Sequence, residues 1–288
     1  MKKTLFISLI ISFITILGLN VSARAETTII QVTSNSCEDS MPRINGNYVV
    51  WQGYVNNNWE IFLYNIDTTA TSRITNNSYN DVSPRTDGNY VVWLGASNEG
   101  SEIFLYDIAK GGSPTHITID TNVDCPPRIA DGRVVWASHQ VTNSVEPGQI
   151  NLYDIATGHT LQLGDFAADD CSPRINSETV IWNRVDKNDN ISLYTYDLAG
   201  GTARRAPRDF IWKESPQTDG KLTVSLIHDN NNSEIIIRDS DQEEFEQITH
   251  NSINDRHPGI SGNYIIWMGG EGQASEIYLA LYGTGPFL

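Results

Sequence analysis

The sequence predicts an all-β protein, a six-bladed β-propeller, because one pattern of strands and turns occurs six times. Six prolines mark the copies at intervals of 42, 43, 46, 43 and 42 residues: Pro42, Pro84, Pro127, Pro173, Pro216 and Pro258. Nine positions after five of these prolines stands a tryptophan: Trp51, Trp93, Trp136, Trp182 and Trp267. A period of forty-odd residues is typical of proteins in which every repeat forms one sheet and stacks on its neighbours.

Each copy is expected to supply a four-stranded antiparallel blade. The segment around the proline is the innermost strand, and a glycine such as Gly46 or Gly88 makes the turn that follows. A β-branched and aromatic run then leads to the tryptophan, and a second run, EIFLYNI in the first copy, forms the third strand. A weaker alternating segment completes the unit. The fifth copy departs from the pattern, with Ser225 in place of the tryptophan.

The N-terminal segment 27–33 resembles the closing strand of the other copies. The sixth copy contains only three strands before Leu288, so we expect segment 27–33 to complete the last blade and close the ring. Without that strand the last blade would keep an exposed edge, which proteins usually avoid. The alternative is an open solenoid of six repeats.

Residues 1–25 are predicted to be a signal peptide, and residues 26–288 a single propeller domain. Lys2 and Lys3 precede an apolar run, and Ala23-Arg24-Ala25 is typical of a cleavage site. The alternative, a retained membrane anchor, requires a longer apolar run. We therefore expect an exported monomer, periplasmic or extracellular, without membrane insertion after cleavage.

The formal net charge of −16 disfavours nucleic acid and anionic membranes as partners. Cleavage after Ala25 removes Lys2, Lys3 and Arg24 and no acidic residue, which changes the charge from −16 to −19. The expected partner is therefore a protein or a polysaccharide of the cell envelope. A second interpretation of the acidic composition is that the protein binds a cationic partner or Ca²⁺.

Two charged positions flank the expected innermost strand and are the candidate binding residues. Three residues before the proline stands an aspartate in five copies: Asp39, Asp81, Asp124, Asp170 and Asp255. One residue after the proline stands an arginine in four copies: Arg43, Arg85, Arg128 and Arg174. We expect both sets to ring the channel near one mouth. They either pair between neighbouring blades through charge-assisted hydrogen bonds, or bind a basic partner segment or Ca²⁺, with the five aspartates as its ligands.

Three cysteines occur in the sequence. Cys125 and Cys171 both lie two residues before their prolines in neighbouring copies, so a disulfide between them is one expectation for an oxidising compartment. Equivalent positions of adjacent blades can also exceed the roughly 7 Å between Cα atoms that a disulfide tolerates. Cys37 has no evident partner in the sequence.

No catalytic motif stands out among the six scattered histidines. The loop 186–190 alternates oxygen-bearing side chains but lacks the glycine and glutamate of an EF-hand. Arg204, Arg205 and Arg208 form a basic cluster that we expect on a solvated outer edge. A polysaccharide lyase would need a base near the sugar C5 and cations for the uronate, such as His, Tyr and Arg side chains at a channel mouth.

The repeated S-P-R-x-D-G, V-V-W, E-I-F-L-Y-D and I-T-N segments resemble the propeller repeat of the TolB family, often called WD40-like, and are similar to bacterial and archaeal cell-surface propellers. The resemblance implies a periplasmic or surface protein that binds other proteins, often at the mouth of the channel. TolB itself has a separate α/β domain before its propeller, which this sequence does not match. We therefore favour a non-enzymatic binding scaffold, with a polysaccharide lyase or glycoside hydrolase, or a structural matrix protein, as alternatives.

Overall fold

The computed structural model describes residues 27–97, 100–120, 122–139, 148–163, 169–185, 188, 191–206, 218–219, 222–229, 232–239 and 245–282. Within these residues the polypeptide forms strands and one short 3₁₀ turn, η1 (Gly272–Ala274). The predicted signal peptide, residues 1–25, lies outside them. In the part of the sequence that is described, no helix is long and apolar enough to span a membrane.

Most copies of the repeat form one four-stranded antiparallel sheet. The sheet of the first copy runs β2 (Asp39–Asn45), β3 (Tyr48–Val55), β4 (Asn58–Asn65) and β5 (Ala70–Arg73). The fourth copy forms β15 (Asp169–Ile175), β16 (Thr179–Val185), β17 (Ile191–Asp197) and β18 (Thr202–Arg205). The fifth copy forms β19 (Thr218–Asp219), β20 (Leu222–Asp229), β21 (Asn232–Asp239) and β22 (Phe245–Gln247).

The second and third copies are joined into one nine-stranded sheet. The second copy contributes β6 (Asn80–Thr86), β7 (Tyr90–Ser97), β8 (Gly100–Asp107) and β9 (Thr115–His116). The third contributes β10 (Val123–Asp124), β11 (Arg128–Ala130), β12 (Arg133–His139), β13 (Gln149–Asp154) and β14 (His159–Gln162). A single parallel pair, Val123 with Ser101, connects them. Apart from that pair, each copy keeps its own antiparallel arrangement.

The N-terminal and C-terminal segments build the last sheet together. The sixth copy supplies β23 (Asp255–Ser261), β24 (Tyr264–Gly269) and β25 (Glu276–Leu281). The N-terminal strand β1 (Thr28–Gln31) pairs antiparallel with β25, from Thr28 opposite Leu281 to Gln31 opposite Tyr278. The N-terminal segment therefore forms the fourth strand of this sheet, as its sequence suggested.

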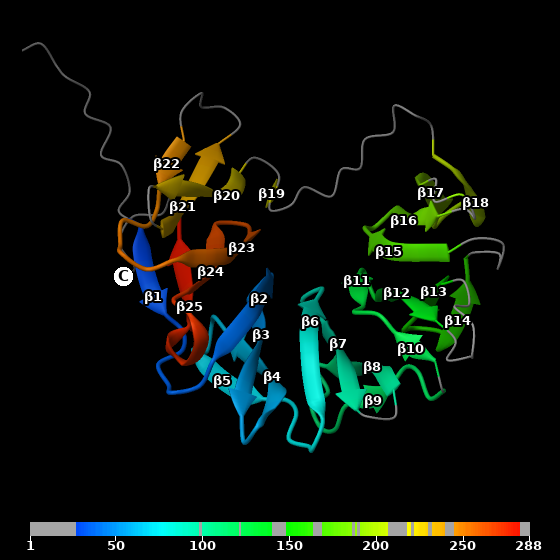
Figure 1. The fold of residues 1–288 in the computed structure, drawn as a ribbon, viewed down its shortest axis with the longest axis horizontal. Helices are drawn as coiled ribbons and strands as arrows, with labels where there is room; N and C mark the ends of the chain where they lie inside the picture. Colours follow the sequence, from blue (N-terminus) through cyan, green and yellow to red (C-terminus); the bar gives the residue numbers. More distant parts are fainter. Residues whose placement is uncertain are drawn as a thin grey trace, which may run out of the picture.

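The sheets stand around a common centre, with β2, β6, β11, β15 and β23 on the inner side (Figure 1). Strand β2 of the first copy lies beside both β6 of the second and β23 of the sixth. The molecule is therefore all-β, with several four-stranded antiparallel sheets arranged as in a propeller.

The core lies between neighbouring sheets. Trp51 packs with Ile266 and Leu279 of the last sheet, whereas Val50, on the opposite face of β3, packs with Trp93 of the second copy. Alternate residues of β3 thus contact different neighbours, because successive side chains of a strand point to opposite faces. Burial of each such side chain stabilises the fold by roughly 1.5–3 kcal/mol.

A β-bulge interrupts the innermost strand of four copies. The residue before the proline has a positive φ, at Met41 (55°), Ser83 (57°), Ser172 (54°) and His257 (52°). The strand register shifts at the same points, as between Ser40 and Arg43. The third copy has Pro126 at this position, and its ring restricts φ to about −65°. The innermost segment of that copy is accordingly divided into β10 and β11.

Candidate functional site

The recurring aspartates form part of the interior of the sheets. Four of the five predicted site aspartates are described with their side chains, and all four are buried: Asp39, Asp81, Asp124 and Asp255. The indole Nε1 atoms of Trp51, Trp93 and Trp136 donate to the first three of these carboxylates, over 2.9, 2.7 and 3.1 Å. The spacing of twelve residues between aspartate and tryptophan therefore encodes a hydrogen bond inside each of these repeats. The side chain of Asp170 lies outside the described residues.

The second oxygen of the carboxylate is held by an asparagine four residues earlier. Asn35 Nδ2 donates to Asp39 over 2.8 Å, and Asn77 Nδ2 donates to Asp81 over 2.7 Å. The oxygen of the same amide accepts the backbone N–H two residues on, as Asn77 Oδ1 does from Tyr79 N at 3.0 Å. Such an Asx turn is a local interaction that short polar side chains form readily. It brings the amide donor directly beside the carboxylate.

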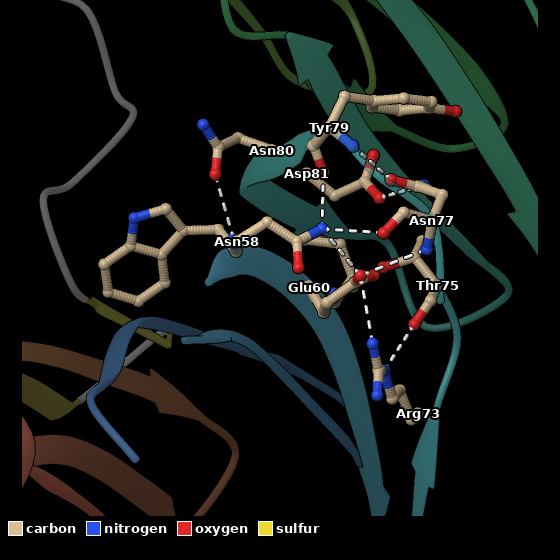
Figure 2. Close-up of polar contacts among 10 residues, drawn as sticks. Asn58, Glu60, Arg73, Thr75, Asn77, Tyr79, Asn80 and Asp81 are labelled. Carbon is tan, nitrogen blue, oxygen red and sulfur yellow. Dashed lines mark hydrogen bonds and ion pairs between the residues drawn. The ribbon is translucent and has the colours of Figure 1, made fainter. Parts of the chain in front are cut away.

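Glu60 joins the first copy to the second (Figure 2). Its side chain is fully buried on β4 and accepts hydrogen bonds from Asn58 Nδ2 at 2.8 Å and from the backbone N–H of Asn77 at 3.1 Å. Arg73 Nη2 lies 3.0 Å from the same carboxylate oxygen. Because a buried carboxylate needs such partners to offset its desolvation, this junction holds the connecting segment in one conformation.

The same junction recurs at three other boundaries between copies. Glu102, Glu234 and Glu276 each accept the backbone N–H at the position corresponding to Asn77. Serine hydroxyls donate to the carbonyl oxygen of the next copy's aspartate: Ser101 to Asp124, Ser233 to Asp255 and Ser275 to Asp39. These glutamates and serines were not identified as site residues from the sequence. The threonine and asparagine that recur six and four positions before the aspartate were the available signal.

Burial raises the pKa of these aspartates. The pKa of Asp81 and of Asp255 rises to about 6, and that of Asp124 to about 7. In the third copy Asp120 replaces the asparagine, so it keeps the Asx turn but has no amide to donate. The negative charge of Asp120 adds to the effect of burial, and Asp124 Oδ2 is buried without a hydrogen-bond partner among the described residues.

The arginines of the innermost strands gather at the centre. Arg43 and Arg85 turn back on their own strands, where each Nη1 donates to the carbonyl oxygen of the preceding proline, at 2.6 and 2.8 Å. Burial lowers the pKa of Arg43, and the charge of Arg174 lowers it further. Their strands, β2 and β15, belong to the first and fourth copies. Side chains from such distant sheets can influence one another only if both extend toward the common centre.

His257 belongs to the same central group. It is half-buried at the bulge of β23, and burial lowers its pKa, with further lowering by Arg43, Arg256 and Arg85. The sixth copy has Gly259 where the first four have arginine. The inner strands around the centre thus carry arginine in the first four copies and His257 in the sixth. Arg128, on β11, is the residue of the third copy that corresponds to Arg43, and its side chain is half-buried.

Other residues named in the sequence analysis lie away from this centre, or their predicted roles stay untested. Cys125 is half-buried with its Sγ 3.9 Å from His139 Nδ1, and the side chain of Cys171 lies outside the described residues, so their disulfide stays a prediction. Arg204 and Arg205 are exposed on β18, as expected for a solvated edge. Among the residues that the structure covers, no three His, Cys, Asp or Glu side chains form a metal site, and binding of Ca²⁺ stays untested.

No protein-family model and no curated protein matches the sequence. Solved structures do match it at low identity. An oligogalacturonate lyase from Vibrio parahaemolyticus is 12% identical with a TM-score of 0.57, over 90% of this chain and 98% of that chain. An acylaminoacyl peptidase from Pyrococcus horikoshii is 12% identical with a TM-score of 0.57, over 87% of this chain and 52% of that chain.

TolB from Acinetobacter baumannii is 15% identical with a TM-score of 0.48, and the match covers 88% of this chain and 57% of TolB. The present sequence thus spans little more than half the length of that protein. At these identities the similarity concerns the fold alone, which is that of a β-propeller.

Proposed function

We propose that this protein is an exported, TolB-like six-bladed propeller that acts as a non-enzymatic binding scaffold. Its central arginines hold an anionic group of a protein or of a cell-envelope glycan. The observation that carries the proposal is the place of Arg43, Arg85 and Arg174 on three inner strands, β2, β6 and β15, which with β23 and its His257 stand around one centre (Figure 1). A guanidinium group binds carboxylates and phosphates with paired, charge-assisted hydrogen bonds.

A closed ring of six blades is the arrangement that this proposal requires. The hydroxyl of Ser275 bonds Asp39 just as Ser101 bonds Asp124 and Ser233 bonds Asp255. Ile277 N donates to Thr33 Oγ1 over 2.8 Å, as Ile61 N donates to Thr75 Oγ1. The sixth copy therefore meets the first through the contacts that join other consecutive copies. This equivalence supports a ring in which every innermost strand faces the same channel.

The arginines of the inner strands contrast with the acidic charge of the whole protein, and this contrast favours a specific anionic ligand. The net charge is −16, so the protein as a whole repels anions at long range. The innermost strands of the first four copies nevertheless carry arginines, whose guanidinium groups can pair with a carboxylate. Such a carboxylate is present in a uronate and at the C-terminus of a peptide.

Calorimetric titration with trigalacturonate and with a short peptide ending in a free carboxylate tests the proposal, with maltotriose as the neutral comparison. We expect one of the two anions to bind, and its affinity to fall with added salt. The double variant Arg43→Gln/Arg85→Gln should weaken binding at least tenfold. Arg204→Gln, on exposed β18, is the matched control and should leave the affinity unchanged. Equal affinity in the double variant and the wild type would contradict the proposal.

A uronate lyase is the second candidate, and His257 favours it. A histidine with a lowered pKa is neutral at pH 7 and can remove a proton, while the neighbouring arginines offset the carboxylate charge of the sugar. Incubation with polygalacturonate and measurement of the ultraviolet absorbance of unsaturated products separates the two candidates. Product formation that His257→Gln abolishes would establish the lyase. Binding without product supports the scaffold.

A further inference from the structure

A cavity of about 380 Å³ lies in the first copy, away from the central arginines. It is bounded by the segment after β1, by β3 and by the outer strands of the first sheet. Phe62, Trp51, Cys37, Asn35 and Arg73 are among the residues that line it. A cavity of roughly 150 Å³ is enough to hold benzene, so this space can accept one substituted aromatic ring.

The second copy contains the same aromatic wall. Phe62 stacks on Trp51 with ring centroids 5.6 Å apart, and Phe104 stacks on Trp93 at 5.7 Å. In both copies a glycine two residues after the tryptophan leaves room for the ring. A Cβ at Gly95 would lie 2.4 Å from Phe104, and a Cβ at Gly53 would lie 2.8 Å from Phe62.

The two copies differ opposite the phenylalanine, where His116 pairs with Phe104 and Arg73 with Phe62, and they differ in the residue two positions before the aspartate. In the second copy this residue is Tyr79, whose ring stacks on Phe104 with centroids 5.9 Å apart. In the first copy it is Cys37, which has no ring. Phe104, packed against both Tyr79 and the ring of His116 at 4.2 Å between centroids, is only 7% exposed, whereas Phe62 remains half-buried.

The sixth copy fills the position in a different way. Ile253 is the corresponding residue, and its Cδ1 lies 2.9 Å from the Cβ site of Gly269, beside the ring of Tyr278. Thus an aromatic ring or a branched aliphatic side chain occupies this place in two copies of the repeat. Cys37 is too small to do so.

We propose that the cavity beside Cys37 binds a small neutral phenol, whose ring takes the place that Tyr79 holds in the second copy. The ring would stack on Phe62, since offset aromatic pairs contribute roughly 0.5–1.5 kcal/mol beyond the area that they bury. The exposed hydroxyl of Thr71 beside the cavity suits the hydroxyl group of the phenol, whereas Thr33 and Asn35 already bond Glu276 and Asp39. This site is independent of the anion site at the centre.

Saturation-transfer NMR with p-cresol tests the proposal on the purified protein. We expect saturation transfer to p-cresol in the wild type, and at least fivefold weaker binding of cyclohexanol, which cannot stack. Cys37→Tyr should abolish p-cresol binding and raise the melting temperature, because the new ring fills the cavity. Cys37→Ser is the matched control: it keeps the space, removes the thiol and should bind p-cresol as the wild type does.

Three results would overturn the proposal: no transfer to p-cresol in the wild type, equal binding of cyclohexanol, or unchanged p-cresol binding in Cys37→Tyr. If Cys37→Tyr does not fold, Cys37→Leu provides the second test, because Ile253 shows that a branched aliphatic side chain is accommodated at this position. Cys37→Leu should then bind p-cresol at least tenfold more weakly than Cys37→Ser. Equal binding by these two variants would likewise overturn the proposal.

Discussion

The aspartates and the arginines of the innermost strands lie four residues apart, yet they face different surroundings. Asp39 is buried against Trp51, whereas Arg43 extends toward the centre, within the influence of Arg174. In a regular strand, residues four apart point to the same side. The register shift between Ser40 and Arg43 adds one residue, and this β-bulge reverses the alternation. One irregular residue thus separates a structural carboxylate from a candidate binding cation.

Loss of a buried carboxylate should lower the free energy of unfolding more than any other substitution predicted below. Asp81→Ala leaves the indole N–H of Trp93 and the amide of Asn77 without their acceptor. We expect the free energy of unfolding to fall by about 3 kcal/mol. Urea denaturation measures this change, and Arg85→Ala, four residues further on, should cost less than about 1 kcal/mol. Equal losses in the two variants would remove the distinction between the two positions.

The stability of the fold should decrease as the pH rises from about 4 to 7. Asp81, Asp124 and Asp255 have pKa values of about 6, 7 and 6 when folded, above the roughly 3.9 of an unfolded aspartate. The folded state therefore binds more protons than the unfolded state in this range, and deprotonation favours unfolding. His257 acts in the opposite direction, because its pKa is lowered on folding, but it is one group against four, since burial also raises the pKa of Asp39. Melting temperatures across this range, which we expect to be highest near the acid end, provide the test.

Asp120→Asn should stabilise the third copy by about 1 kcal/mol above pH 7, where Asp124 is ionised. The new amide can donate to Asp124 Oδ2, as Asn77 does to Asp81. At pH 5, where Asp124 is protonated, the gain should be smaller. The reverse change, Asn77→Asp, should destabilise the second copy by a similar amount. Chemical denaturation at both pH values measures the effects, and a gain that does not depend on pH would contradict the explanation.

Arg43→Gln should change stability least, by no more than about 0.5 kcal/mol. The substitution removes a charge that Arg174 disfavours, and this gain offsets the loss of the bond to the carbonyl oxygen of Pro42. The thermal unfolding curve provides the measurement, with Arg204→Gln as a surface control. A decrease of several kcal/mol would show that the central arginines support the fold and would weaken their assignment as binding residues.

Much of the fold could be predicted from the sequence because the same pattern of strands and turns occurs in all six repeats. The prolines and tryptophans locate the innermost strand and its neighbour, and the β-branched runs between them mark the strands. Segment 27–33 resembled a closing strand, and β1 does pair with β25. The candidate site was predicted less well. The aspartates and arginines were expected in one ring, whereas the carboxylates of Asp39, Asp81 and Asp124 bond tryptophans inside the sheets.

The sequence by itself determined the repeat, its strands, and the residues that each copy places near its inner strand. Only the tertiary structure decided which of these side chains meet. The positive φ at Met41 or Ser83 depends on the partner strand, and no local preference of methionine or serine indicates it. The cavity beside Cys37 likewise depends on packing against Phe62 of the same sheet. Local patterns recur along the sequence, but the direction of a side chain at a bulge and the space left by a smaller residue arise from contacts between distant segments.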